Sequence, residues 1–140
     1  MSTPADGAER CIFCEIADGR APAYRVYEDE RAVAFLDLFP FTRGHLLVIP
    51  KRHGARLTDL APEDREGVIH ALAVMSRRAE RLTPDYNVAL NAGTRAGQIV
   101  FHLHFHLIPR YGEANPFQQR ERVRLTDAEA ASLVAELSLP

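Results

Sequence analysis

Hydrophobic and polar residues alternate in several short stretches of this chain, and one longer stretch repeats its apolar residues at helical spacing. Its apolar positions are Val68, Leu72, Met75, Ala79 and Leu82. Intervals of three and four residues are typical of one buried face of a helix. The pattern predicts a helix over residues 61–82, with Thr58 or Asp59 as its N-cap.

Five other stretches have the alternation or the apolar run expected of β-strands. They are residues 24–27, 32–36, 45–50, 86–91 and 100–108. The first two flank an acidic turn and form a predicted hairpin, while the nearly continuous apolar run of the third favours a central strand. Strands in succession with one long helix predict an α+β fold with an antiparallel sheet of about five strands.

The two ends of the chain differ from this central part. Residues 1–9 are polar and predicted to be disordered, and residues 11–17 form one or two predicted helical turns. Near the other end, Thr126 and Glu129 form a capping-box pattern that predicts a final helix over residues 127–137. The predicted organisation is a disordered N-terminus (1–9), one domain (10–112) and a C-terminal extension with a helix (113–140).

Composition narrows the class of protein. The chain has 140 residues, of which 46% are hydrophobic and 26% charged, which is ordinary for a globular domain. Its net charge of -2 argues against general binding of nucleic acid or an anionic membrane. No apolar stretch approaches the roughly 18 residues of a membrane span, and the N-terminus lacks the pattern of a signal peptide. We therefore expect a cytoplasmic protein.

Three histidines alternate with apolar residues in the last predicted strand. His102, His104 and His106 are two residues apart, so their side chains point to one face at intervals of about 6.6 Å. A neutral imidazole can attack phosphorus, and a protonated one can hold anionic oxygens. Imidazoles at this spacing also bind metals. From spacing alone, catalysis, metal binding and a structural role all stay open.

The motif and its neighbours resemble the histidine triad (HIT) family. The matching segments are residues 102–108, 11–16, 26–30, 34–37, 44–53, 91–93 and 97–98. The resemblance implies the HIT-like fold, with a short N-terminal helix. It also implies cleavage at the α-phosphate of nucleoside phosphoramidates or dinucleoside polyphosphates, with a purine nucleotide as substrate. Short members of the family are typically homodimers whose sheets join into one.

The resemblance also assigns roles to individual residues. His104 matches the nucleophile, His106 the phosphate contact, and His102 a supporting or metal-binding histidine. Asp37 matches the residue that binds the ribose hydroxyls. The other nucleotide-binding positions are Asn91 near the phosphate, Gly97 and Gln98 with backbone N–H groups facing it, and Ile16, Phe35 and Leu47 around the base.

One position departs from the family pattern. Many members carry Ser or Thr after the Gly-Gln pair, where the hydroxyl can bond the phosphate or the leaving group. Here the residue is Ile99, which has no hydroxyl and places proton delivery to the leaving group in question.

The cysteines Cys11 and Cys14 form a C-x-x-C pair. Such a pair is compatible with ordinary thiols or a redox pair, and a zinc site needs two more ligands. Similarity to bacterial HIT proteins implies a structural zinc held by Cys11, Cys14, His53 and His102. His45 is interpreted as a buried, hydrogen-bonded group behind the triad, and His70 as a surface residue.

Three functions are therefore compatible with the sequence. The first is a HIT nucleotide hydrolase or transferase that needs no cofactor for its chemistry. The second is a non-catalytic nucleotide-binding or interaction module, favoured by the missing hydroxyl at Ile99. The third is a metal-dependent hydrolase that uses all three triad histidines.

Overall fold

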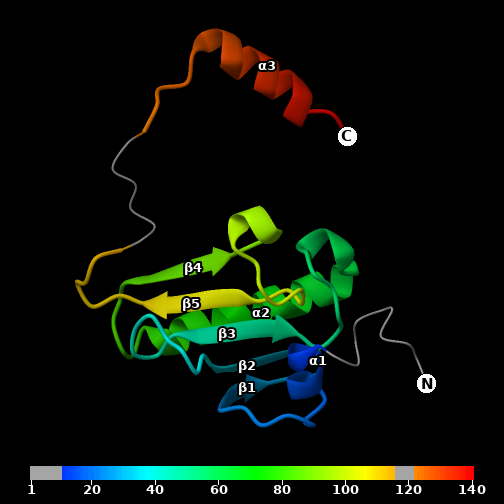
Figure 1. Ribbon diagram of the computed structural model, residues 1–140, viewed down its shortest axis with the longest axis vertical. Coiled ribbons are helices and arrows are strands. Elements are labelled where there is room, and N and C mark those ends of the chain that lie inside the picture. The colour runs from blue at the N-terminus through cyan, green and yellow to red at the C-terminus, as the bar shows by residue number, and fades with distance from the viewer. Residues whose placement is uncertain (1–10, 116–121) are drawn as a thin grey trace.

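Five antiparallel strands form one sheet in the computed structural model, which describes residues 11–115 and 122–140. The strands are β1 (Arg25–Glu28), β2 (Ala32–Leu36), β3 (Leu46–Pro50), β4 (Tyr86–Leu90) and β5 (Phe105–Pro109). Their order is β1-β2-β3-β5-β4, so the last strand β5 lies between the central β3 and the edge strand β4 (Figure 1). The predicted α+β class and five-stranded antiparallel sheet are confirmed.

The helices lie on either side of this sheet or beyond it. They are α1 (Ile12–Ala17), α2 (Pro62–Ala79) and α3 (Asp127–Leu137), with short 3-10 turns η2 (Leu57–Asp59) and η3 (Thr94–Ala96). The long helix α2 crosses one face of the sheet, and α3 lies away from it (Figure 1). The predicted helix over 127–137 is confirmed, including its capping box between Thr126 and Glu129.

Two apolar clusters hold these layers together. Alternate residues of β2, β3 and β5 pack against α2, with Val48, Leu103 and Leu107 each fully buried. The opposite face packs against α1 through Phe13, Ile16, Val33, Phe35, Leu47 and Ile49. The sheet is therefore covered on both faces near its centre, as the apolar run of β3 predicted.

The start and end of α2 differ from the prediction. The N-cap is Ala61 and makes no side-chain capping bond, whereas Thr58 and Asp59 belong to η2. Asp59 instead accepts a hydrogen bond from the Arg56 backbone N–H at 3.0 Å. The helix ends at Ala79, so Leu82 lies in the following turn and is 41% exposed.

The last strand is also shorter than predicted. Strand pairing begins at Phe105, so residues 100–104 approach the sheet without joining its ladder. The Leu103 N–H donates to the Gly54 carbonyl at 2.7 Å instead of to a neighbouring strand. The Leu103 side chain is fully buried in the cluster that packs on α2, which accounts for apolar alternation that continues outside the strand. The predicted disorder of residues 1–9 lies outside the described residues.

Candidate active site

The two faces of the segment that leads into β5 have different environments. Leu103, Phe105 and Leu107 are buried on the α2 side. The intervening histidines point to the other side. There the ring centroids of His104 and His106 lie 5.0 Å apart, and the ring centroid of Phe13 lies 5.0 Å from that of His104. The alternation predicted from sequence therefore persists through the unpaired residues.

The His104 ring is oriented by the backbone of its own segment. Its Nδ1 lies 2.8 Å from the His102 carbonyl oxygen. A carbonyl can only accept, so Nδ1 carries the proton and Nε2 keeps its lone pair. Burial lowers the pKa of His104, which also favours the neutral ring. A neutral imidazole with a free Nε2 lone pair is the form required of a nucleophile.

His106 is the triad member that lies within β5. Its Nδ1 is 3.0 Å from Nε2 of His45, a ring that is only 2% exposed. Burial lowers the pKa of His106 to about 4, and the His104 and His45 rings act in the same direction. In the protein without a ligand, His106 is therefore neutral near pH 7.

A cleft of about 380 Å³ opens over these two histidines. Its described lining residues are Phe41, Ala89, Asn91, Gly97, Ile99, Val100, His104, His106 and Ile108. Four of the predicted site residues, Asn91, Gly97, His104 and His106, come together in this lining. Ile99 lies at the same cleft, 87% exposed.

Sequence reasoning missed four of the lining residues. Ile108 is two positions after His106 and thus shares its face, a signal that the alternation contained. Ala89 reaches the cleft because β4 pairs it with His106, a register that no sequence pattern specified. Val100 was part of the predicted strand 100–108 and on the face of the histidines, but the structure places it in a loop before β5. Phe41 also comes from a loop, for which strand periodicity has no prediction.

The backbone N–H groups of the Gly97-Gln98 turn have partners inside the loop. The Gly97 N–H donates to the Thr94 carbonyl and the Gln98 N–H to the Gly93 carbonyl, at 3.0 and 3.1 Å. Contact of these two N–H groups with a phosphate stays a prediction. Gln98 is buried, and its side-chain amide holds the loop by donating to the Ala55 and Val100 carbonyls.

Gly97 still has a reason to be glycine. Its φ of 93° lies in the left-handed region, which other residues rarely adopt. A Cβ at this position would lie 3.7 Å from Asn91 Nδ2. That distance is an ordinary van der Waals contact, so the backbone conformation and not the space requires glycine here.

The other predicted nucleotide-binding residues lie beside the cleft or below it. Asp37 accepts the Phe39 N–H at 2.8 Å, and its second oxygen is 3.6 Å from His45 Nε2. Phe35 and Ile16 are 4% and 6% exposed in the α1 cluster. Among the described residues that line the cleft, neither of these two apolar residues is found, and their contact with a base stays a prediction.

A second group of histidines lies with the cysteines. The ligand atoms of Cys11, Cys14, His53 and His102 all lie within 4.8 Å of one another. His102 Nδ1 is 3.4 Å from both sulfurs, and His53 Nδ1 is 3.2 Å from Cys14 Sγ. A tetrahedral zinc ion places sulfur and nitrogen ligands roughly 3.5 Å apart, given Zn–S and Zn–N bonds of about 2.3 and 2.0 Å.

The protonation of His102 fits this cluster. Its Nε2 lies 2.8 Å from the Pro50 carbonyl oxygen, so that nitrogen carries the proton and Nδ1 offers a lone pair to the sulfurs. His102 therefore faces the cysteines and not the cleft. The hypothesis of one metal held by all three triad histidines is wrong, because among the described residues His102 groups with the cysteines and His106 with Asp37 and His45.

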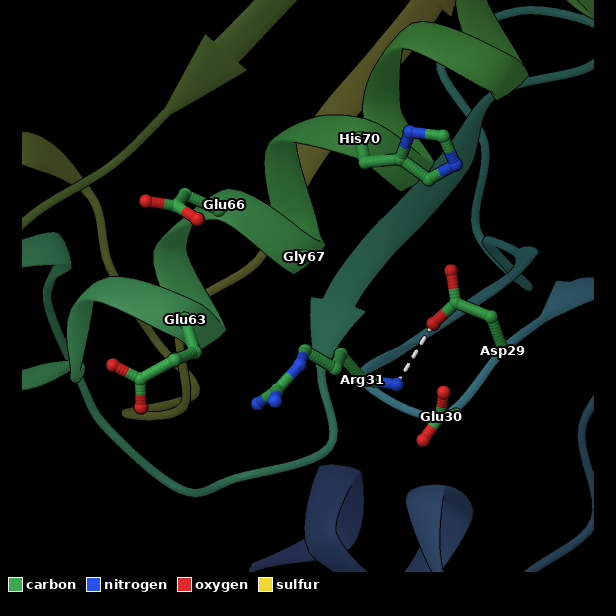
Figure 2. Close-up of a pocket in the computed structure, with 7 residues that line it drawn as sticks. All are labelled: Asp29, Glu30, Arg31, Glu63, Glu66, Gly67 and His70. Atoms are coloured by element: carbon green, nitrogen blue, oxygen red, sulfur yellow. Dashed lines mark hydrogen bonds between the residues drawn. The ribbon is translucent and has the colours of Figure 1, made fainter.

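A larger depression of about 460 Å³ lies away from the triad, between α2 and the turn that joins β1 and β2. Its described lining consists of Asp29, Glu30, Arg31, Glu63, Glu66, Gly67 and His70 (Figure 2). The side chains drawn in Figure 2 point in different directions, and the dashed bond joins the Asp29 carboxylate to the Arg31 backbone N–H. The depression therefore offers no convergent set of groups for chemistry.

Comparison with known proteins gives a consistent result. The family model described as "HIT domain" matches residues 18–113. Protein hit of Bacillus subtilis is 45% identical over 112 residues, covering 79% of this chain and 77% of the relative. Adenosine 5'-monophosphoramidase HNT1 of Saccharomyces cerevisiae is 42% identical over 114 residues, covering 81% of this chain and 70% of the relative.

Solved structures agree. A crystal structure of a HIT family member from Bacillus subtilis is similar to this chain with a TM-score of 0.82 at 36% identity, covering 91% of this chain and 94% of that one. The structure of a protein from Leishmania major gives a TM-score of 0.83 at 38% identity, covering 94% of this chain and 95% of that one.

Proposed function

This chain belongs to the histidine triad family, and we propose that it cleaves nucleotides at the α-phosphate through a nucleotidyl-histidine intermediate. The observation that carries the proposal is the His104 ring, whose Nδ1 is bonded to a carbonyl and whose Nε2 is left with its lone pair at the cleft. The proposed substrates are nucleoside phosphoramidates or dinucleoside polyphosphates.

The proposed reaction has two displacements. The His104 Nε2 lone pair forms a bond to the α-phosphorus, and the bond from phosphorus to the leaving group breaks with its electron pair on that group, which takes up a proton when it is an amine. Water then attacks the same phosphorus, the bond to Nε2 breaks with its electron pair on nitrogen, and a nucleoside monophosphate and neutral His104 are released. The proton that water gives up to the solvent balances the one that the amine took up. Two easier steps replace one difficult displacement.

Neighbouring residues have proposed supporting roles. The His106 ring and the Asn91 amide line the same cleft as His104 and can donate to phosphate oxygens as charge moves onto them. Asp37 lies beside this cleft through its contact with His45 and is proposed to accept hydrogen bonds from ribose hydroxyls. The yeast relative named as an adenosine 5'-monophosphoramidase supports the phosphoramidate class.

We further propose that Cys11, Cys14, His53 and His102 hold a structural zinc ion. Two thiolates and two imidazoles are a common tetrahedral ligand set for zinc. The ion would join α1 to the segment that leads into β5, and its role is to hold the fold and not to take part in the reaction.

A homodimer is also proposed. The family resemblance implies it, and β4 is an edge strand of the sheet with Val88 44% exposed at its centre. An exposed edge of this kind can pair with the same strand of a second copy.

A second candidate function has one observation in its favour. Ile99 places an exposed apolar side chain at the cleft where a hydroxyl could have delivered a proton. A non-catalytic nucleotide-binding module of the same fold would bind nucleotide and release no product.

The deciding experiment replaces the proposed nucleophile. His104→Ala should lower kcat for adenosine phosphoramidate by at least about a thousandfold, because no other group forms the covalent bond. Mass spectrometry of quenched wild-type enzyme should detect a nucleotide adduct that the variant lacks. His70→Ala, on the exposed face of α2, is the matched control and should keep full activity. Full turnover by His104→Ala would exclude the mechanism, and binding without turnover by the wild type would favour the binding module.

A further inference from the structure

His45 contacts polar groups from three different segments behind the cleft. Its Nδ1 lies 3.0 Å from the Phe41 backbone N, its Nε2 lies 3.0 Å from His106 Nδ1, and Asp37 Oδ2 is 3.6 Å from the same Nε2. The His45 side chain is 1% exposed. Water therefore does not compete for these bonds, and the protein groups alone determine where the ring proton lies.

The Phe41 backbone decides the protonation of His45. A backbone N–H can only donate, so His45 Nδ1 must accept and cannot itself carry a proton. The one ring proton of neutral His45 is then on Nε2. A doubly protonated ring would set two N–H groups against each other, and burial, which lowers the pKa of His45, disfavours that state as well.

The His45 proton in turn decides the protonation of His106. His45 Nε2–H points at His106 Nδ1, which must therefore be the acceptor. The proton of neutral His106 is left on Nε2, the ring nitrogen not bonded to His45. The Asp37 carboxylate lies near the donor and stabilises the positive end of this N–H bond.

The same proton assignment argues against a metal among these residues. Asp37, His45 and His106 have ligand atoms within 4.8 Å of one another. A metal would need the lone pair of His45 Nε2, but that nitrogen carries the proton. A hydrogen-bonded chain accounts for the cluster better than a metal site does.

We propose that His45 is a positioning residue that holds His106 in its Nε2–H form, so that His106 presents a donor to the substrate's phosphate oxygens. The identity of that substrate rests on the proposed function above. The other His106 tautomer would present a lone pair to an anionic oxygen, which is repulsive. The chain from Phe41 through His45 thus lets a neutral His106 act as a donor without becoming charged.

The Phe41 loop connects this chain to the cleft itself. The Phe41 ring stacks on His45 with centroids 5.4 Å apart and an interplanar angle of 8°. The same ring is 70% exposed and lines the cleft. One residue therefore supplies both the backbone donor that sets His45 and part of the surface that a substrate would contact.

The test compares two amide replacements of His45. A glutamine side chain is long enough for its amide N–H to reach His106 Nδ1. An asparagine side chain can accept from the Phe41 N–H but is too short to reach His106. His45→Asn should lower kcat about ten- to a hundredfold, in line with the loss of one aligned donor, while KM changes less than threefold. His45→Gln should recover most of the lost kcat.

A direct readout needs no substrate. Ring ¹⁵N shifts of His106 should show a protonated Nε2 and an unprotonated Nδ1 in the wild type and in His45→Gln, and a mixture of both forms in His45→Asn. His70→Gln, the same change at an exposed histidine, should alter neither the shifts nor kcat.

The possible outcomes separate this proposal from the function. A protonated His106 Nδ1 in the wild type overturns the positioning role, as does a His45→Asn variant with unchanged shifts and kcat, or a His45→Gln variant no better than Asn. If thermal unfolding shows that His45→Asn does not fold, His45→Phe replaces it as the variant without a donor. The changes in shifts and kcat expected of His45→Asn are then expected of His45→Phe. A wild type with the expected shifts but no turnover would contradict the proposed function alone.

Discussion

At the scale of single residues, backbone groups determine what each histidine of this site can do. The His102 carbonyl leaves the His104 lone pair on Nε2, and the Pro50 carbonyl leaves the His102 lone pair on Nδ1. Chemically identical side chains two residues apart thereby differ in which nitrogen keeps a lone pair. The resemblance to the family predicts a different role for each, and these contacts supply a physical reason for such a division.

Ile99 is the residue whose replacement should change activity in a selective way. Ile99→Ser adds a hydroxyl at the cleft, where it can donate to a departing amine. We expect kcat for an alkyl phosphoramidate to rise by about tenfold, a modest share of what general acid catalysis can supply. A substrate with a good leaving group, which needs no proton, should change less than twofold.

Parallel kinetics on the two substrates measure this difference, with Ile99→Val as the matched control because it changes the volume without adding a hydroxyl. An equal effect of Ser and Val on both substrates would show that proton delivery at this position is unimportant.

At the scale of elements, the cysteine pair connects a six-residue helix to the body of the protein. Cys11 is the N-cap of α1, where its sulfur accepts the Cys14 N–H at 3.4 Å, and α1 otherwise depends on the apolar contacts of Phe13 and Ile16. A helix this short is not stable by itself in water. Tertiary contacts, with the proposed zinc among them, must therefore hold it.

Removal of one thiolate should test the zinc proposal. Zinc at a hundred times its Kd stabilises the fold by about 2.7 kcal/mol, which corresponds to roughly 10 °C in Tm for a chain of this size. Cys14→Ser should abolish bound zinc and lower Tm by about that amount.

Elemental analysis and thermal unfolding, each with and without a chelator, provide the measurement. Chelation should lower the Tm of the wild type and leave that of Cys14→Ser unchanged. Wild-type protein that contains no zinc and is insensitive to chelator would disprove the site.

At the scale of the whole molecule, the described chain is one sheet with a helix on each face and a separate helix α3 (Figure 1). In the part that the structure describes, no helix is long and apolar enough to cross a membrane. We expect global stability to depend on pH through the histidines on the α1 side. We expect assembly to depend on the exposed edge strand β4.

Stability should fall as the solution becomes acidic. The pKa of His106 is about 4 in the folded protein, below its ordinary value of 6.5. Between these values the unfolded chain binds a proton that the folded chain does not, so the free energy of unfolding decreases as pH falls from about 6.5 to about 4. One such proton contributes a slope of at most about 1.4 kcal/mol per pH unit.

Urea unfolding from pH 7 to pH 4.5 measures this slope. His106→Gln removes the titrating group, so its slope should be shallower than that of the wild type, while His70→Gln should match the wild type. Identical slopes for all three proteins would contradict the assignment of a partly buried, neutral His106.

Assembly should depend on β4 and not on β1, the opposite edge of the sheet. Val88→Lys places a charge at the centre of β4 and should convert a dimer into a 15.7 kDa monomer. Val26→Lys makes the same change on β1 and should leave the dimer intact. Light scattering distinguishes these outcomes, and a monomeric wild type would reject the homodimer.

Local sequence signals were sufficient for features that depend on neighbouring residues. The capping box of Thr126 and Glu129 and the helix after it need only local hydrogen bonds, and both were predicted correctly. Alternation along residues 102–108 was enough to separate the apolar face that packs on α2 from the histidine face, because that period is a property of extended backbone itself.

Long-range contacts decided the remainder. The start of β5, the turn that uses the Gly97 and Gln98 N–H groups, and the pairing of Ala89 with His106 all depend on segments distant in sequence or on loop geometry. The sequence by itself determined which residues are the candidates for the chemistry. Only the tertiary structure decided which nitrogen of each histidine carries a proton, because that depends on carbonyls and N–H groups that folding brings to each ring.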